Sequence, residues 1–178
     1  MTTYRFYGAR HSIVGLGNKI NFDIETSAHF LPRLKDLMHL GFDWLVDRRR
    51  VYVWQQFVGL FYPHLKDTTY LEPFYFDLLQ DCAGRLSLQN PKRVVVEAYM
   101  RLLEYEGRLH LNDDCYICHQ QLGEHVTLMR SFIPAHKECV YASEFEKARI
   151  FGLFESKRSL AFDDNEIEYL YNLVLKGL

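Results

Sequence analysis

The chain has 178 residues, of which 48% are apolar and 15% aromatic, and its formal net charge is −2. This aromatic content excludes a disordered chain and is enough to build the core of one domain or two small ones. The nearly neutral charge gives no general sign of nucleic-acid binding, so any DNA-binding surface has to be a local basic patch.

The first segment, residues 1–25, has the pattern of β-structure. Ile20, Phe22 and Ile24 alternate with polar residues, which is the period of a half-buried strand. Two or three strands of this length do not form an independently stable sheet. We therefore expect them to pack on the rest of the chain or to belong to a sheet that is incomplete here.

Helical spacing replaces this alternation from about residue 28, where Phe30, Leu34 and Leu37 recur at three- and four-residue steps. Further helices are predicted over residues 49–65, 71–86, 90–107 and 143–155, and from 163 onward. Asn90-Pro91 is a typical helix start, and Asp163 stands three residues before Glu166, as in a capping box. The predicted fold class is α+β, mainly α, with a helical bundle.

Residues 108–142 follow neither period and contain Cys115, Cys118 and Cys139. No apolar core of a signal peptide is present in residues 1–10, and no apolar run approaches a membrane span. We therefore expect a cytoplasmic protein, in which closely spaced cysteines are more often metal ligands than disulfides.

The strongest local motif is Cys115-Tyr-Ile-Cys118 followed, after seventeen residues, by His136-Lys-Glu-Cys139. Two pairs with this spacing can complete a tetrahedron around zinc, and a site filled by four protein ligands is structural. His110, His119 and His125 are alternative candidates to His136 for the fourth ligand. The alternative to a metal site is that these cysteines are buried, unreactive thiols that bind no metal. Cys82 lies on a helical pattern and is interpreted as a core thiol.

Several basic residues are candidates for phosphate contacts. Arg48-Arg49-Arg50 is the densest basic run, although it could equally be a solvated helix junction, and the nearby Tyr52 and Trp54 fit a core better than a base-stacking surface. Basic side chains in a first helical turn oppose the helix dipole, which hints at an external anion beside Lys92 and Arg93. The N-terminal β segment adds three more candidates, Arg5, Arg10 and Lys19.

The sequence contains none of the catalytic motifs that would predict an enzyme. The Gly15-Leu-Gly17 segment lacks the third glycine of a dinucleotide-binding turn, and neither a P-loop nor a nucleophile elbow is present. We therefore predict a protein that binds rather than catalyses.

Essentially the whole chain resembles the RecO family, and most closely RecO proteins of the epsilonproteobacterial type. The residues that carry this resemblance are Tyr4–Ser12, Gly17–Glu25, Phe30–Gly41, Asn90–Val94, the two ligand pairs and Asp164–Tyr171. The resemblance implies an N-terminal OB-fold, a helical domain and a zinc finger. It assigns residues 1–26 to an OB-like remnant and residues 27–178 to a helical domain with a zinc finger at 108–142.

Relative to that family pattern, roughly two dozen residues that form the first OB strands are expected before Tyr4, so the OB barrel is expected to be truncated. The resemblance also implies a mediator of DNA repair and recombination that acts at the nucleoid. Such a protein binds single- and double-stranded DNA, anneals strands and helps to load RecA together with RecR and single-strand-binding protein.

Two rival hypotheses remain. A zinc-stabilised interaction module would dock partner proteins without binding DNA itself. A zinc hydrolase would need an open coordination position for water, which four protein ligands exclude.

Overall fold

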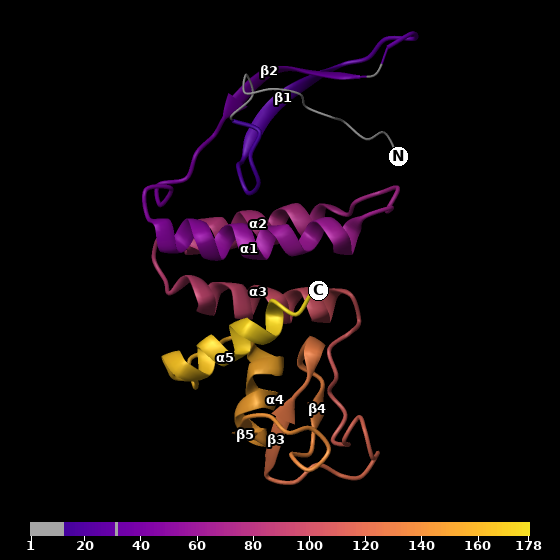
Figure 1. Cartoon of the computed structure of the whole chain (residues 1–178), viewed down its shortest axis with the longest axis vertical. Coiled ribbons are helices and arrows are strands. Elements are labelled where there is room, and N and C mark those ends of the chain that lie inside the picture. The colour runs from indigo at the N-terminus through magenta and orange to yellow at the C-terminus, as the bar shows by residue number, and fades with distance from the viewer. Residues whose placement is uncertain (1–12, 31) are drawn as a thin grey trace. The chain divides into compact units, whose positions relative to one another are not determined.

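The structure is a computed structural model that describes residues 13–30 and 32–178 (Figure 1). The chain divides into two compact units, Met1–Ser87 and Leu88–Leu178. Helices predominate and the strands form two small sheets, which confirms the predicted α+β, mainly α class. Within the described residues, no helix is both long and apolar enough to cross a membrane.

The first unit contains a two-stranded antiparallel sheet of β1 (Ile20–Glu25) and β2 (Arg33–His39). The strand expected at residues 20–25 is confirmed, whereas the helix expected from residue 28 is wrong. Asn21 pairs with Met38 and Asp23 pairs with Lys35, so a step of two residues along β1 is matched by a step of three residues along β2. Asp36 has a φ of 51°, so it is the extra residue of a β-bulge in β2.

This bulge explains why the apolar spacing from residue 28 onward wrongly predicts a helix. Leu34 and Leu37 are the partly buried residues of β2, and the bulge sets them three positions apart instead of two. Three residues is also the spacing of neighbours on a helix face, so apolar spacing alone could not distinguish the two structures.

Helices α1 (Arg48–Leu65) and α2 (Pro73–Arg85) complete the first unit and confirm the helices predicted at 49–65 and 71–86. Asp47 caps α1 by accepting hydrogen bonds from the backbone N–H groups of Arg49 and Arg50. Buried residues of this unit include Val53, Trp54, Phe57, Phe61, Leu78 and Cys82, so Cys82 is a core thiol as predicted.

The second unit is built on α3 (Pro91–Tyr105), which contacts α5 (Asp164–Val174). Asn90 caps α3, and Asp163 and Glu166 form the predicted capping box of α5. Most side chains of α3 are buried, and the Tyr99 ring lies edge-on to Phe132 at a centroid distance of 5.3 Å.

A second small sheet and α4 (Lys147–Ser156) complete the unit. The sheet has the order β4 (Pro134–Ala135), β3 (His125–Leu128) and β5 (Glu144–Glu146), with antiparallel pairs. The 3₁₀ turn η2 (Arg130–Phe132) joins β3 to β4. The helix predicted at 143–155 therefore begins later, after β5.

The predicted boundary at residue 26 falls between β1 and β2, inside the first unit. The predicted finger segment 108–142 lies within the second unit, and the predicted bundle helices are divided between the two units.

Candidate metal centre and basic surface

The first ligand pair lies in a tight turn closed by backbone hydrogen bonds. The N–H of His119 donates to the Cys115 carbonyl at 2.9 Å, and the N–H of Cys115 donates to the Gln120 carbonyl at 2.8 Å. His119 itself has a φ of 58°, a left-handed conformation that reverses the chain directly after Cys118. The turn thereby directs Cys115 and Cys118 toward one point.

The second ligand pair follows β4 in a similar turn. The N–H groups of Cys139 and Val140 both donate to the His136 carbonyl at 3.1 Å. The ligand atoms of Cys115, Cys118, His136 and Cys139 all lie within 4.8 Å of one another. The structure therefore brings together the four predicted ligands, and this cluster can hold a metal ion.

Hydrogen bonding orients the His136 ring. Its Nε2 lies 3.0 Å from the Gln121 carbonyl oxygen, and its Nδ1 lies 3.3 Å from Cys118 Sγ. Nε2 is thus the donor to the carbonyl, which leaves Nδ1 as the atom that faces the sulfurs. Among the described residues, the competing His110, His119 and His125 lie outside the cluster.

The protein environment shifts the pKa values of the ligand groups. Burial opposes ionisation of Cys115, but backbone N–H groups, first that of Cys118 and then that of His136, lower its pKa to about 6. The N–H of His136 lies 3.4 Å from the Cys115 sulfur. Burial and then the neighbouring sulfurs of Cys118 and Cys115 raise the pKa of Cys139 to about 11.

The donor set determines what the cluster can do. Three sulfurs and one imidazole nitrogen form a typical zinc ligand set, and such a tetrahedron separates its ligand atoms by about 3.5–3.8 Å for Zn–S bonds of about 2.3 Å and Zn–N bonds of about 2.0–2.1 Å. The observed spacing is compatible with that geometry. Four protein ligands leave no position for a reactive water, so the cluster suits a structural role.

The predicted phosphate-binding residues of the first unit have different environments. Arg5 and Arg10 lie outside the described residues. Arg48 and Arg49 are exposed in the first turn of α1, and no ion pair engages them within the described part of the chain. By contrast, Arg50 is held by Asp47 through an ion pair of 2.8 Å.

The aromatic side chains that follow this basic run also differ. Trp54 is buried, as predicted, with its indole N–H donating to the Gly17 carbonyl at 2.7 Å. Tyr52 is exposed, so the prediction that it belongs to the core is wrong. It occupies a neighbouring position on α1, where the helical period turns it away from Trp54.

Lys92 and Arg93 are held by contacts within the second unit. Lys92 pairs with Glu168, and Arg93 donates to the carbonyls of Ser159 and Phe162 at 2.8 and 2.7 Å and to Asp164 at 3.1 Å. Acidic residues of α5 thus supply the anions beside Lys92 and Arg93, so an external anion is not needed to explain these basic side chains. A DNA contact by these two residues stays a prediction.

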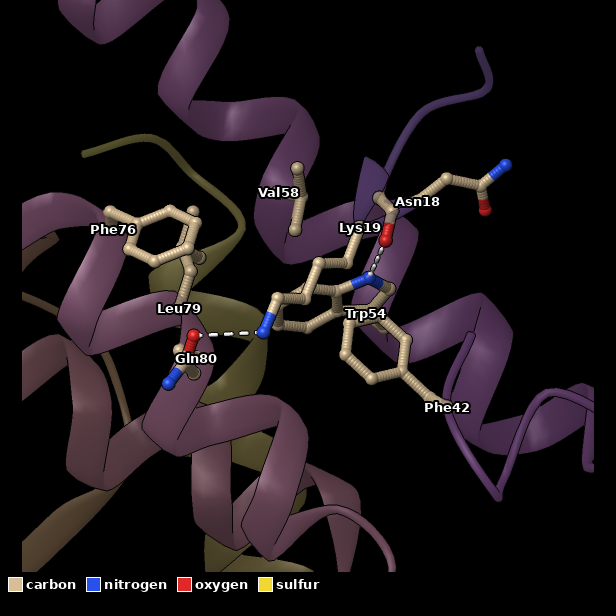
Figure 2. Close-up of a pocket in the computed structure, with 9 residues that line it drawn as sticks. Asn18, Lys19, Phe42, Trp54, Val58, Phe76, Leu79 and Gln80 are labelled. Carbon is tan, nitrogen blue, oxygen red and sulfur yellow. Dashed lines mark hydrogen bonds between the residues drawn. The ribbon is translucent and has the colours of Figure 1, made fainter. Parts of the chain in front are cut away.

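Lys19 lies at a pocket that sequence reasoning missed. The pocket is formed by the turn before β1, the segment between β2 and α1, the middle of α1 and the middle of α2 (Figure 2). It is lined by Gly17, Asn18, Lys19, Phe42, Trp54, Val58, Phe76, Leu79 and Gln80. These segments are far apart in the sequence, and none carries a recognisable motif. Only the folded chain shows that their aromatic side chains surround one space.

Comparison with known proteins gives one family match. Residues 1–45 match the family model described as RecO N terminal, a range that contains β1, β2 and Lys19. No curated protein matches the chain. The match supports a broad relationship to the RecO family and, at the level of that family, a role in DNA repair and recombination.

Proposed function

We propose that this chain is a non-enzymatic, RecO-like mediator that binds single- and double-stranded DNA and anneals complementary strands. The observation that carries the proposal is the match of residues 1–45 to the RecO N-terminal family model. Cooperation with RecR and single-strand-binding protein in loading RecA, at the nucleoid in the cytoplasm, belongs to the same proposal. An epsilonproteobacterial type and a truncated OB-fold stay predictions from the sequence.

Zinc is the proposed metal of the Cys115, Cys118, His136 and Cys139 cluster. The donor set and the closed coordination support it. The metal would hold together two turns that lie on either side of the β3–η2–β4 segment. Its proposed role is therefore to stabilise the second unit rather than to activate water.

The first unit supplies the proposed DNA contacts, namely Arg48, Arg49 and Lys19. Acidic side chains outnumber lysine and arginine within Leu88–Leu178, whereas basic side chains slightly outnumber acidic ones within Met1–Ser87. Exposed arginines without acidic partners can neutralise phosphates at little cost. Arg5 and Arg10, which lie outside the described residues, stay predicted phosphate contacts.

Salt-dependent binding to labelled single-stranded DNA tests the proposal. We expect the affinity of the zinc-loaded chain to fall steeply with salt, because each phosphate contact releases counterions. Arg48→Ala/Arg49→Ala should weaken binding and reduce the log–log salt slope by about one per contact removed. The matched control, Arg158→Ala/Lys176→Ala, removes the same charge from exposed positions of the second unit and should bind like the wild type.

Salt-independent binding, or an equal effect of both double variants, would contradict this assignment. Either result would mean that the exposed arginines of α1 do not form a specific DNA surface.

A second candidate function is a zinc-stabilised interaction module that does not bind DNA. It is favoured by an apolar groove of about 370 Å³ between α1 and α2 that includes the exposed Tyr62, Leu71 and Phe76. Exposed aromatic side chains around a groove are typical of protein docking surfaces. Association with RecR or single-strand-binding protein, without measurable DNA affinity, would favour this candidate.

A further inference from the structure

The pocket beside Lys19 has mainly apolar walls and a polar rim (Figure 2). The rings of Phe42, Trp54 and Phe76 line it, and Val58 and Leu79 complete the apolar surface. The space measures about 170 Å³. Phe76 is 57% exposed, so its ring is accessible to a molecule that enters from solvent.

Local packing fixes the shape of the pocket before any ligand enters. The indole N–H of Trp54 donates to Gly17, whose φ is 82°, and a Cβ on Gly17 would lie only 2.5 Å from that indole nitrogen. Phe42 lies beside Trp54, with an edge-on contact at a centroid distance of 6.0 Å, and stacks on Trp44 with a centroid distance of 4.9 Å and an interplanar angle of 5°. This wall is therefore preorganised, which lowers the entropic cost of binding.

The rim combines one cation with one amide. Lys19 Nζ donates to Gln80 Oε1 at 2.9 Å and lies 5.9 Å from the centroid of the Phe76 ring. Asn18 also borders the pocket, but its side-chain amide donates to the Ile13 carbonyl at 3.0 Å and points away from the space (Figure 2). No carboxylate of the described residues belongs to the lining. The ammonium group is thus paired with a neutral partner, which an incoming anion can displace at low cost.

A flat ring system with polar edges and an adjacent negative charge fits these features together. Nucleobases have this character, because their faces stack on aromatic side chains while their edges form hydrogen bonds and a phosphate lies nearby. An aliphatic ligand would use the apolar walls but leave the cation and the Gln80 amide without a function. The lining therefore favours a nucleotide over a purely apolar group.

We propose that this pocket takes one unstacked base of single-stranded DNA, with the base packed against Phe76 and with Lys19 transferred from Gln80 to a neighbouring phosphate. The inference rests on the proposed DNA-binding function and deepens it, because it assigns a base contact in addition to phosphate contacts. The contact is sequence-tolerant, since every base has a face that can stack.

Paired oligonucleotides test this proposal in the zinc-loaded chain. A twelve-residue oligothymidine and an abasic strand of the same length carry equal numbers of phosphates and differ in their bases. We expect the wild type to prefer the thymidine strand by roughly 5- to 150-fold, the range of one base–aromatic stacking contact. Phe76→Ala should remove most of this preference while leaving binding to the abasic strand nearly unchanged.

Two further variants separate the pocket from general effects of mutation. Val58→Phe narrows the pocket without removing an aromatic wall, and it should also remove the base preference. Tyr141→Ala deletes an exposed aromatic ring of the second unit and should retain it. Circular dichroism establishes that each variant is folded.

The possible failures of the two proposals are distinguishable. Salt-dependent binding of both strands with equal affinity would overturn the base pocket and leave DNA binding intact. An unchanged preference in folded Phe76→Ala and Val58→Phe would overturn it as well. No binding to either strand at low salt would overturn both proposals.

Discussion

Cys115 is the most deeply placed residue of the metal cluster. It is fully buried, and backbone N–H groups from both ligand turns point at its sulfur. Cys118 is exposed and Cys139 partly so, which makes Cys115 the ligand that links the cluster to the interior of the second unit. Its loss should therefore affect both metal binding and folding.

Replacing Cys115 by serine should abolish stoichiometric zinc binding and lower the melting temperature, because the remaining three ligands leave the tetrahedron open. Zinc content by atomic absorption and thermal unfolding by circular dichroism check this. Cys82→Ala is the matched control, since it removes a buried thiol of the first unit and should retain one zinc per chain. Equal zinc content in both variants would show that the cluster is not the metal site.

Gly17 is a second residue with a specific steric requirement. Its positive φ and its close approach to Trp54 leave no room for a side chain. Gly17→Ala should destabilise the chain by about 1–3 kcal/mol, from backbone strain and from displacement of the indole. Urea unfolding measures this, with Gly84→Ala in α2 as a control, because a Cβ at Gly84 meets nothing within 4 Å. A neutral Gly17→Ala would mean that the turn is not held against α1.

At the scale of elements, α5 depends on charges at its first turn. Arg149 of α4 donates to both carboxylate oxygens of Glu166, which also accepts the N–H of Asp163 in the capping box. The Arg149 contact lowers the pKa of Glu166, although burial partly opposes this. One side chain thus caps α5 and connects it to α4.

A lowered folded-state pKa makes this contribution dependent on pH. The stabilisation by Glu166 should be fully present above its ordinary pKa of 4.5 and should be lost as pH falls through the lower folded-state value. We expect Glu166→Gln to cost about 1 kcal/mol at pH 7 and progressively less on acidification. Paired urea unfolding of both proteins between pH 7 and pH 3 checks this. A difference that is constant with pH would contradict the role of the charge.

The elements also show which parts of the fold could be predicted. Asn90-Pro91 and the Asp163–Glu166 pair act through neighbours in sequence, so they marked the starts of α3 and α5 correctly. The clustering of the four candidate metal ligands was also predictable, because each pair acts within one turn. The bulge at Asp36 was not, since an extra residue in a strand reproduces helical spacing. The base pocket was equally hidden, because its walls come from segments that only the fold brings together.

At the scale of the whole molecule, the chain combines two units of different chemical character. The first has exposed arginines, an aromatic pocket and one more basic than acidic side chain, whereas the second has three more acidic than basic side chains and the candidate metal cluster. In the proposed function, DNA binding belongs to the first unit and metal-dependent stability to the second. The zinc centre should therefore influence DNA binding only through the stability of the chain.

The most direct test of the central claim is the rate at which the zinc-loaded chain anneals two complementary labelled oligonucleotides, followed by energy transfer at low salt. We predict annealing faster than the spontaneous rate. High salt should suppress it, Arg48→Ala/Arg49→Ala should slow it, and Arg158→Ala/Lys176→Ala should not change it. A spontaneous rate at low salt, from a folded chain that carries its zinc, would contradict the claim that this protein is a DNA-annealing mediator.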